Sequence, residues 1–516
     1  MSAVQKDRSV AQLLNSAAAS HGNKEVIYDL KKRLTYNELL KLSERAANGL
    51  QKLGIKKGDR VGVCLPNWHE TAVIFFAASK LGAVVVPFNP VYRSHEIEYI
   101  LKNAEPSVLF ISEKFGENVG FPLAKALVKH VVSVRFEERE LLSYTKLLAN
   151  HGEVVREEAV DVNEDLFCIL YTSGTTGLPK GVMTAHRSIV QCAYTVAEEM
   201  KCDKRDVFII PAPLFHIFGI TCNLMTAIAS GARMILQEKY HPKQVLKLIE
   251  KEKVTVHQGV PTMFLKELEQ EDFSQYDLSS LRTGMVGASP ISPEQVKKVR
   301  KQMNFHLCQS YGITETGSVT ITRHNDDEKT LLETVGRPLK GIKIKIVDKN
   351  HNPLPPGQVG EIAVHSFAMM KGYYKMPDKT SQVLEKEGWF YTGDLGMVDE
   401  KGNVRFTGRQ KEMIIRGGFN IYPQEIEAIL TKHPKVIEAA VIGLPDEVLG
   451  ETVCAVIQLK KSIKCTEEEM KNFTAESVAA FKVPEQVVFT SNFPVTASGK
   501  IQKGKLKDQL LERINS

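Results

Sequence analysis

The stretch YTSGTTGLPKGV, residues 171–182, has the composition of a loop that binds an anion. It contains three glycines, a proline and five hydroxyl side chains, and it directly follows the apolar run LFCIL. Backbone N–H groups and hydroxyls at the end of a strand are suited to bind the phosphates of a nucleotide. A surface turn of similar composition is the alternative.

The residues beside Lys180 exclude the P-loop of nucleoside triphosphatases. That loop needs a glycine directly before its lysine and a hydroxyl directly after it, where the hydroxyl binds Mg²⁺. Here Pro179 precedes Lys180 and Gly181 follows it. Any phosphate contact must therefore use a different loop, with a lysine at its far end.

Length and composition indicate a globular protein of more than one domain. The 516 residues exceed what one hydrophobic core usually supports, and 43% hydrophobic and 25% charged residues are typical of a soluble chain. A net charge of +6 without a dense Lys/Arg stripe argues against a nucleic-acid partner.

The cysteines and the first residues predict a cytoplasmic protein. The eight cysteines form no C-x-x-C pair and no Cys/His cluster at zinc spacing, which favours reduced thiols over disulfides or a zinc site. The opening MSAVQKDRSVAQLL lacks the apolar core of a secretory signal. The uncharged segment 217–232 is too short and too polar for a membrane span, so we expect a buried helix beside a ligand pocket.

Strand-like and helix-like runs alternate in the first part of the chain. Apolar runs at 60–66 and 83–89 flank a helical pattern at 67–82, and the same alternation recurs at 94–112 and 242–261. Such alternation predicts an α/β domain in which helices sandwich β-sheets.

The pattern changes after about residue 335. Short β-like pieces with glycine turns come first, and an α+β pattern then runs to the end of the chain. We therefore expect an N-terminal domain at 1–407, which includes a β-subdomain, a hinge at 408–411 and a small C-terminal domain at 412–516.

Five motifs occur in the order and at the separations of a known superfamily. They are YTSGTTGLPKGV at 171–182, YGITETG at 311–317, GWFYTGD at 388–394, GRQKEMIIRGGFNIYPQEIE at 408–427 and PVTASGKIQK at 494–503. Together they resemble the adenylate-forming superfamily of acyl-CoA synthetases, nonribosomal adenylation domains and firefly luciferase. The resemblance covers almost the whole chain and implies a mobile C-terminal domain, with the active site between the two domains.

The resemblance also implies a two-step reaction that uses ATP, Mg²⁺ and coenzyme A. A carboxylate attacks the α-phosphorus of ATP to give an acyl-adenylate and pyrophosphate, and a thiol then displaces AMP. Because the first step brings two anions together, catalysis should consist largely of charge neutralisation and positioning.

By the same resemblance, Thr172 and Glu315 bind Mg²⁺, a hard cation that prefers oxygen ligands. Outside the YGITETG motif, Glu315 would be read as a solvated or helix-capping carboxylate. The residues expected to hold the β- and γ-phosphates are Thr172, Ser173, Gly174, Thr175, Thr176, Gly177 and Lys180.

The nucleoside is expected between three further motifs. Asp394 resembles the carboxylate that accepts hydrogen bonds from both ribose hydroxyls. Arg409 resembles a ribose and phosphate contact, with an interdomain salt bridge as its alternative, and Tyr311 resembles the ring that stacks on adenine, with a core aromatic as its alternative. The remaining residues of the predicted AMP site are Gly287, Ala288, Ser289, Gln309, Ser310, Gly312 and Thr314.

Lys500 is the predicted catalytic lysine. In the superfamily such a lysine reaches across the domain interface to the carboxylate and the α-phosphate, where a flexible point charge suits a transient anion. The alternative is a solvated lysine in a basic tail. Gln502 stands where an arginine is frequent in the superfamily, so a second cationic contact there is in doubt.

The acyl end of the site begins at His216, which resembles a ring that moves between carboxylate and thioester geometries. A buried structural histidine is the alternative. Ile217 stands where an amino-acid-adenylating domain has an aspartate, and no acidic residue occurs from 214 to 232, so an unpaired substrate ammonium is disfavoured. The other predicted acyl-site residues are small or apolar: Phe218, Thr221, Met285, Val286, Gly287, Gly312, Gly317 and Val319.

These acyl-site residues suit an alkyl chain or an aryl propenoate about equally. A medium- or long-chain fatty acid is favoured because no residue among them offers a phenolic hydroxyl a strong partner. The alternatives are an aryl, coumarate-like CoA ligase, an enzyme that loads a carrier protein, a luciferase-like oxygenase and an idle relative. An idle relative would be expected to lose Lys180, Glu315, Asp394 or Lys500, and all four are present.

The two half-reactions predict rotation of the C-terminal domain about Lys411. Adenylation needs Lys500 at the phosphates, whereas thioester formation needs a path for coenzyme A along Gly417, Gly418 and Phe419, with no side chain at Gly418. The expected partners are a small carboxylic acid, ATP and coenzyme A. No nucleic acid and no integral membrane segment are expected, and a homodimer is left open.

Overall fold

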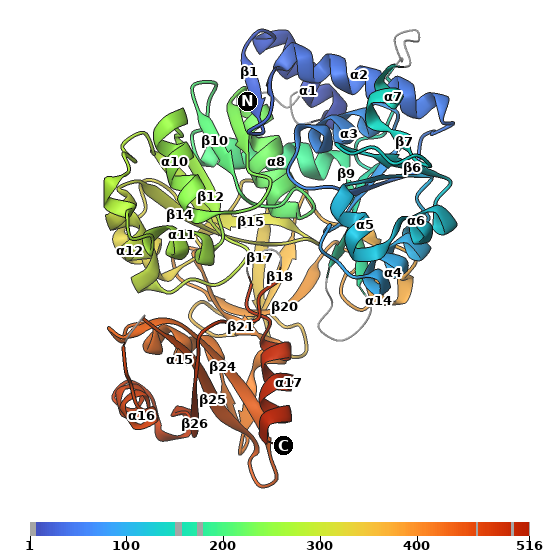
Figure 1. Cartoon of the computed structure of the whole chain (residues 1–516). Helices are drawn as coiled ribbons and strands as arrows, with labels where there is room; N and C mark the ends of the chain where they lie inside the picture. Colours follow the sequence, from blue (N-terminus) through green and yellow to red (C-terminus); the bar gives the residue numbers. More distant parts are fainter. Residues whose placement is uncertain (1–6, 150–156, 173–178, 461–462, 497–499, 515–516) are drawn as a thin grey trace.

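The computed structural model describes residues 7–149, 157–172, 179–460, 463–496 and 500–514. A large N-terminal domain sits above a smaller C-terminal domain, which is drawn in orange and red in Figure 1. Sheets of nine, eight, four and five strands organise this part of the chain.

The nine-stranded sheet carries most of the motif residues. Its order is β16-β15-β14-β13-β12-β10-β11-β1-β2, and the pairs from β1 through β14 are parallel except at the β1–β2 edge. Its strands are β1 (Glu25–Tyr28), β2 (Arg33–Thr35), β10 (Val207–Ile210), β11 (Arg233–Leu236), β12 (Val256–Gly259), β13 (Thr283–Val286), β14 (His306–Ile313), β15 (Gly317–Ile321) and β16 (Arg337–Pro338).

The eight-stranded sheet has the order β19-β9-β8-β4-β3-β5-β6-β7 and begins and ends with short strands. Its central strands are apolar on both faces, which is typical of parallel strands covered by helices on each side. The strands are β3 (Arg60–Cys64), β4 (Val84–Pro87), β5 (Val108–Ile111), β6 (His130–Ser133), β7 (Leu142–Ser143), β8 (Leu166–Thr172), β9 (Lys180–Ala185) and β19 (Gly372–Tyr373).

Helices fill the space between these two sheets and cover their outer faces (Figure 1). The middle layer holds α1 (Val10–His21), α2 (Tyr36–Lys52), α3 (His69–Lys80), α7 (Tyr144–Ala149), α8 (His186–Glu199), the π-helical segment η2 (Phe218–Met225) and α9 (Thr226–Ser230). The outer layers hold α4 (Ser94–Ala104), α5 (Glu113–Val119) and α6 (Phe121–Leu127) on one side, and α10 (Pro242–Glu252), α11 (Pro261–Leu268) and α12 (Pro293–Met303) on the other. The predicted sandwich of sheets and helices is therefore confirmed.

The segment predicted as a buried helix at 217–232 consists of η2 followed by α9. Every residue of η2 is buried, so the uncharged sequence reflects packing between the sheets. No helix in the described part of the chain is long and apolar enough to cross a membrane.

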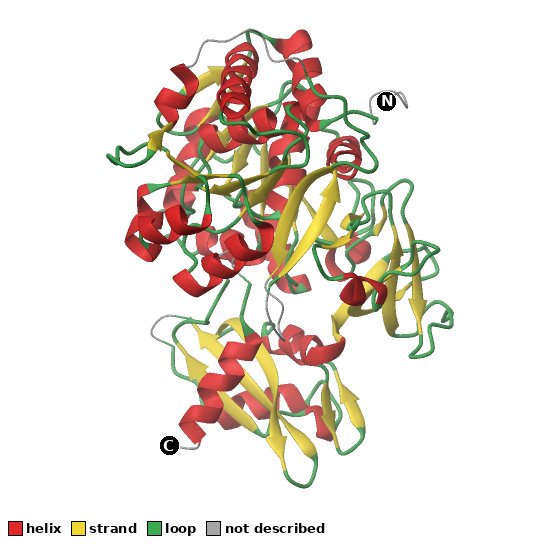
Figure 2. Cartoon of the chain, turned by 90° about the vertical axis from the view of Figure 1, so that its right-hand side faces the viewer, coloured by secondary structure: helices red, strands yellow, loops and turns green. Residues whose placement is uncertain are grey.

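A four-stranded antiparallel sheet forms the β-subdomain, and a five-stranded sheet forms the core of the C-terminal domain (Figure 2). The first contains β17 (Lys343–Val347), β18 (Gly360–His365), β20 (Phe390–Val398) and β21 (Val404–Arg409), with the short helices η3 (Phe273–Gln275), α13 (Glu328–Glu333) and α14 (Pro377–Ser381) elsewhere in the N-terminal domain. The second contains β22 (Ile414–Arg416), β23 (Phe419–Ile421), β24 (Val436–Asp446), β25 (Gly450–Leu459) and β26 (Gln486–Thr490), with α15 (Pro423–Leu430), α16 (Glu467–Ala475), η5 (Ala480–Lys482) and α17 (Lys503–Ile514). The one-turn 3₁₀ helix η4 (Gln410–Glu412) joins the two sheets.

Candidate active site

Parallel pairing of β13 and β14 brings two of the sequence motifs together. Residues 287–289 follow β13 directly, and residues 309–312 occupy the last part of β14. The carboxyl ends of parallel strands meet at one edge of a sheet, where α/β proteins commonly bind ligands. A Cβ on Gly287 would lie only 3.2 Å from the carbonyl oxygen of Ser310. The next residue, Ala288, has a left-handed φ of 64°.

Asp394 is buried among groups that fix its orientation. The hydroxyl of Tyr311 donates to Oδ2 of Asp394 at 2.8 Å, and Nε of Arg409 lies 3.4 Å from Oδ1. Burial raises the pKa of Asp394, while Arg409, the Tyr311 hydroxyl and Lys500 oppose that shift. Antiparallel pairing of β20 with β21 places Asp394 opposite Arg409, so the hairpin itself brings the two charges together.

Tyr311 packs against Phe406, with ring centroids 5.8 Å apart and planes at 29°. The side-chain amide of Gln309, on the same strand, donates to the carbonyl oxygens of Leu331 and Leu332 at 2.9 and 3.2 Å. Gln309 is thus held by its own domain, and the adenine contact of residues 309–312 stays a prediction.

Tyr373 connects the phosphate-loop lysine to the predicted Mg²⁺ ligand, and the sequence analysis did not identify it. Nζ of Lys180 lies 4.2 Å from the centre of the Tyr373 ring, and the Tyr373 hydroxyl donates to Oε1 of Glu315 at 2.9 Å. Thr172 pairs with Lys180 across β8 and β9. Tyr373 lies on a short edge strand beside β9, and no motif pointed to it.

Lys500 reaches from the C-terminal domain to His216 of the N-terminal domain. Burial and then the Lys500 ammonium lower the pKa of His216 to about 3, so this imidazole stays neutral at physiological pH. The backbone N–H of Phe218 donates to Nδ1 of His216 at 3.3 Å, which leaves the ring proton on Nε2. Burial, followed by Arg409, lowers the pKa of Lys500 to about 8, although Asp394 and Glu315 favour its charged form.

Lys411 completes a group of neighbouring cations, here called the cation cluster: Lys180, Arg409, Lys411 and Lys500. Burial, Arg409 and Lys180 all lower the pKa of Lys411, and Glu412 and Asp394 oppose them. Like charges brought this close favour an anionic ligand, because its charge relieves their repulsion. The cluster is therefore suited to a polyphosphate.

The glycines of the predicted acyl site differ in what they contact. A Cβ on Gly312 would collide with the carbonyl oxygen of Gly317, and Gly317 has a φ of 68° with Ala368 2.9 Å from its would-be Cβ. Gly312 is thus explained by the close approach of β14 and β15, and Gly317 by its left-handed φ and by the nearby Ala368. Gly287 differs, since its Cβ would point toward the Phe218 ring at 3.7 Å.

The other predicted acyl-site residues are nearly all buried and apolar: Ile217, Phe218, Met285, Val286 and Val319, with the polar Thr221 beside them. The hydroxyl of Thr221 and the side-chain oxygen of Asn223 on η2 are buried without a hydrogen-bond partner among the described residues. Thr221 is thus a predicted acyl-site residue with an unsatisfied oxygen, and Asn223 carries a second one two residues further along η2.

The predicted coenzyme A loop is a hairpin turn of the C-terminal domain. Gly417 and Gly418, with φ of 55° and 84°, form the tight turn between β22 and β23, a conformation that glycine adopts without strain. Phe419 is 56% exposed and stacks on Phe481 at 4.6 Å. Ser173, Gly174, Thr175, Thr176 and Gly177 lie outside the described residues, and Ser289 and Thr314 flank the described strands.

The fold and the cation cluster define an adenylate-forming enzyme. Residues 14–374 match the AMP-binding enzyme family, and residues 425–500 match the AMP-binding enzyme C-terminal domain. The chain therefore belongs to the family of AMP-binding enzymes, in its acyl-CoA synthetase branch, whose members are AMP-forming acid–thiol ligases.

Similar proteins cover the chain almost from end to end. The chain is 37% identical to the putative acyl-CoA synthetase YngI of Bacillus subtilis (strain 168), with 98% of each chain covered. It is 32% identical to the medium-chain acyl-CoA ligase ACSF2, mitochondrial, of Homo sapiens, with 98% of this chain and 88% of that protein covered. The crystal structure of the anthranilate CoA ligase AuaEII in complex with anthranoyl-AMP matches with a TM-score of 0.91 and 27% identity over 99% of both chains.

Removing the charge of Asp394 should weaken ATP binding. Asp394→Asn loses charge-assisted hydrogen bonds worth about 1.5–3 kcal/mol each, so we expect the Kd for ATP to rise about ten- to a hundredfold. Titration calorimetry measures it. Asp399→Asn, in the β20–β21 turn, is the matched control, since its carboxylate accepts hydrogen bonds within that turn, from the backbone N–H groups of Lys401 and Asn403 and from the side-chain amide of Asn403. An Asp394→Asn protein with unchanged ATP affinity would show that the ribose is held elsewhere.

The lowered pKa of Lys500 predicts a fall in adenylation at alkaline pH. Only the ammonium neutralises an anion, and it loses its proton as the pH rises through about 8, so kcat/KM for pyrophosphate release should decrease above that pH. In Lys500→Arg the side chain stays charged, and the alkaline fall should disappear even if the rate is lower. The same fall in both proteins would assign it to another group.

Proposed function

We propose that the chain activates a medium- or long-chain fatty acid with ATP and transfers the acyl group to coenzyme A. The observation that carries this proposal is the cation cluster, whose Lys500 acts on His216, the residue directly before the uncharged, buried segment 217–225. Cations suit the triphosphate and the carboxylate, and the wall suits a chain without charge. The similarity to a medium-chain acyl-CoA ligase supports the choice of acid.

In the first step an oxygen of the fatty-acid carboxylate attacks the α-phosphorus of ATP. The bond from that phosphorus to the bridging oxygen of pyrophosphate breaks, and no proton is transferred. Asp394 holds the ribose, while Arg409 and Lys500 offset the negative charge that gathers at the α-phosphate. His216 would lie beside the carboxylate of the acid. Because its imidazole is neutral, it would not compete with the cations for that carboxylate.

Mg²⁺ fits the oxygen groups at the other end of the triphosphate. Oε1 of Glu315 accepts from the Tyr373 hydroxyl at 2.9 Å, and a carboxylate has further acceptor positions for a metal ion. The Thr172 hydroxyl, on the strand pair that ends at Lys180, is a second hard donor. When bound, the ion neutralises the β- and γ-phosphates and steadies pyrophosphate as a leaving group.

In the second step the thiolate of coenzyme A attacks the acyl carbonyl carbon, and AMP leaves. Lys500 occupies this side of the site in the present arrangement, so we propose that the C-terminal domain turns about Lys411 before the thiol enters. Gln410–Glu412 is a single 3₁₀ turn between two sheets, a place where a few residues can absorb a large change of φ and ψ.

Proline at the hinge should separate the two half-reactions. Proline fixes φ near −65°, which a 3₁₀ turn accepts, but it blocks a large rotation there. We expect Lys411→Pro to release pyrophosphate at a rate within a few-fold of Lys411→Ala, which loses the same ammonium but keeps the backbone free. Thioester formation from supplied acyl-adenylate and coenzyme A should fall only in Lys411→Pro. Equal loss of both steps in Lys411→Pro would contradict a hinge at this residue.

An aryl acid is the second candidate, because Thr221 and Asn223 carry buried oxygens without a partner among the described residues. A substrate hydroxyl or amine could donate to them, and a fatty acid could not. The similarity to an anthranilate CoA ligase is consistent with this alternative.

Thr221→Val distinguishes the two acids, because valine keeps the shape and removes the oxygen. For a fatty-acid ligase, we expect kcat/KM for acids of six to eighteen carbons to be unchanged within about threefold. For an aryl ligase, kcat/KM for coumarate or anthranilate should fall by about tenfold or more, since the substrate donor loses its partner. Pyrophosphate release is assayed with both sets of acids.

The same assay with and without coenzyme A identifies the acceptor. A ligase produces acyl-CoA only when coenzyme A is present. Adenylate that accumulates and is never transferred to coenzyme A would instead indicate a carrier protein or a luciferase-like oxidation as the second step.

A further inference from the structure

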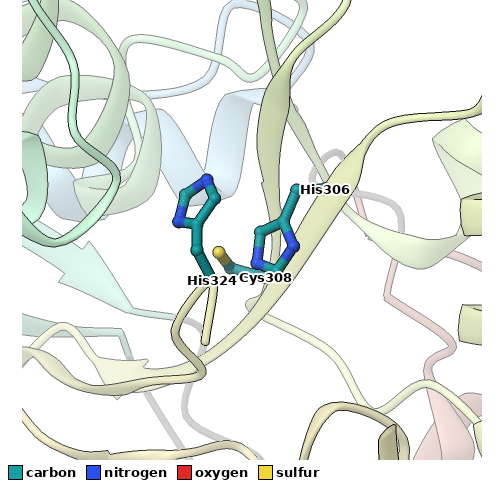
Figure 3. A group of neighbouring side chains, drawn as sticks. All are labelled: His306, Cys308 and His324. Carbon is teal, nitrogen blue, oxygen red and sulfur yellow. The ribbon is translucent and has the colours of Figure 1, made fainter. Parts of the chain in front are cut away.

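Three side chains that commonly bind transition metals lie together at the opposite end of β14 from the nucleotide site. His306 is the first residue of β14, Cys308 lies two residues further on, and His324 follows β15. One ligand atom from each of the three lies within 4.8 Å of the others. Figure 3 shows the sulfur of Cys308 between the edges of the two imidazole rings.

Strand pairing accounts for this arrangement. Residues two apart on a strand point to the same face, so His306 and Cys308 lie side by side. Ser310 pairs with Ile321 across β14 and β15, and Gln309 exchanges hydrogen bonds with Thr322 at 2.8 and 2.9 Å. The chain after β15 therefore runs back along β14, and it carries His324 to the two other side chains.

The two histidines carry buried nitrogens that the described residues leave unsatisfied. Nε2 of His306 and Nδ1 of His324 are buried and have no hydrogen-bond partner within the described ranges. The rings stack with centroids 3.9 Å apart and planes at 17°. Buried ring nitrogens normally have a partner, so this pair lacks something that a bound ion would supply.

The donor atoms of these three residues are those of common metal sites. Neutral imidazole and thiolate are the forms that bind a metal ion, so binding would release the thiol proton of Cys308 to solvent as the sulfur–metal bond forms.

We propose that His306, Cys308 and His324 bind one Zn²⁺ ion through two imidazole nitrogens and one thiolate, with water as the fourth ligand. Nitrogen and sulfur donors select zinc over Mg²⁺ and Ca²⁺, which prefer oxygen. Bonds of about 2.0–2.3 Å to a tetrahedral ion would bring the ligand atoms to about 3.3–3.8 Å from one another, and the two stacked rings would turn so that one nitrogen of each faces the ion.

A second group of similar residues shows why this one differs. Asp29, His69 and Glu70 also lie within ligand distance of one another, but Arg135 occupies their centre, with its guanidinium bonded to Asp29 and 2.7 Å from Glu70. A cation is thus already in place there. One cation near the proposed zinc ligands is Arg282, and it is instead paired with Asp206 at 2.5 Å, beside His306, Cys308 and His324.

A zinc ion at this position would link the start of β14 to the segment after β15. Those strands carry Tyr311 and Val319 further along, so the ion would brace the sheet edge that supports the active site. Its direct effect should be on stability, since a ligand that binds only the folded state raises the free energy of unfolding.

The test uses the untagged full-length chain after removal of metals with a chelator. Titration calorimetry with Zn²⁺ should give one ion per chain, and Co²⁺ should produce the charge-transfer absorption of a cobalt–thiolate bond. Cys308→Ser should abolish that absorption, and His324→Gln should weaken Zn²⁺ binding about tenfold or more. The matched controls are Cys465→Ser and His351→Gln, both outside the cluster, which should bind as the unchanged chain does.

Three results would overturn the proposal. They are no Zn²⁺ binding by the folded, unchanged chain, cobalt absorption that persists in Cys308→Ser, and equal Zn²⁺ affinity in His324→Gln and His351→Gln. Pyrophosphate release with Mg²⁺–ATP shows that each variant is folded. If Cys308→Ser is unfolded, His324→Gln, whose side chain is only partly buried, decides the question. The outcome is independent of which acid the enzyme activates.

Discussion

Repulsion within the cation cluster is the cost that the present arrangement of the two domains must bear. Burial and then Arg409 lower the pKa of both Lys411 and Lys500, so these ammonium groups are held together despite their mutual repulsion. Asp394 and Glu315 offset only part of that cost. On the proposed function a triphosphate would offset the rest, so nucleotide binding would favour this arrangement.

The hinge and the catalytic lysine are connected through the first turn of α17. Nζ of Lys503 lies 2.6 Å from Glu427 on α15 and 3.6 Å from Glu412 in the hinge turn. Lys500 precedes this anchor by three residues, and its own N–H donates to the Thr496 hydroxyl at 3.0 Å. A rotation at Gln410–Glu412, as proposed above, would therefore carry Lys500 with it and would link the two half-reactions mechanically.

Local patterns in the sequence predicted the layered fold. The helix at 69–80 and the strands beside it follow from apolar runs, whereas the Asp394–Arg409 pair was not predicted and follows from the β20–β21 hairpin. Contacts between distant segments were not predictable in this way. Tyr373 reaches Glu315 from an edge strand outside any motif, and the search for zinc spacing missed His306, Cys308 and His324 because strand pairing, not a short spacing along the chain, brings them together.

On the proposed function, selectivity for the acid would depend more on two oxygens of η2 than on the apolar wall. An apolar surface distinguishes chains by about 0.8 kcal/mol per methylene, so neighbouring chain lengths are separated only weakly. A buried acceptor without a partner discriminates more strongly, because a substrate that cannot donate to it leaves it unsatisfied. The Thr221 hydroxyl and the Asn223 side-chain oxygen are in that position among the described residues. An alkyl substrate would have to be accepted despite them, so the strength of its binding must come from the buried aliphatic and aromatic side chains around Phe218 and Met285.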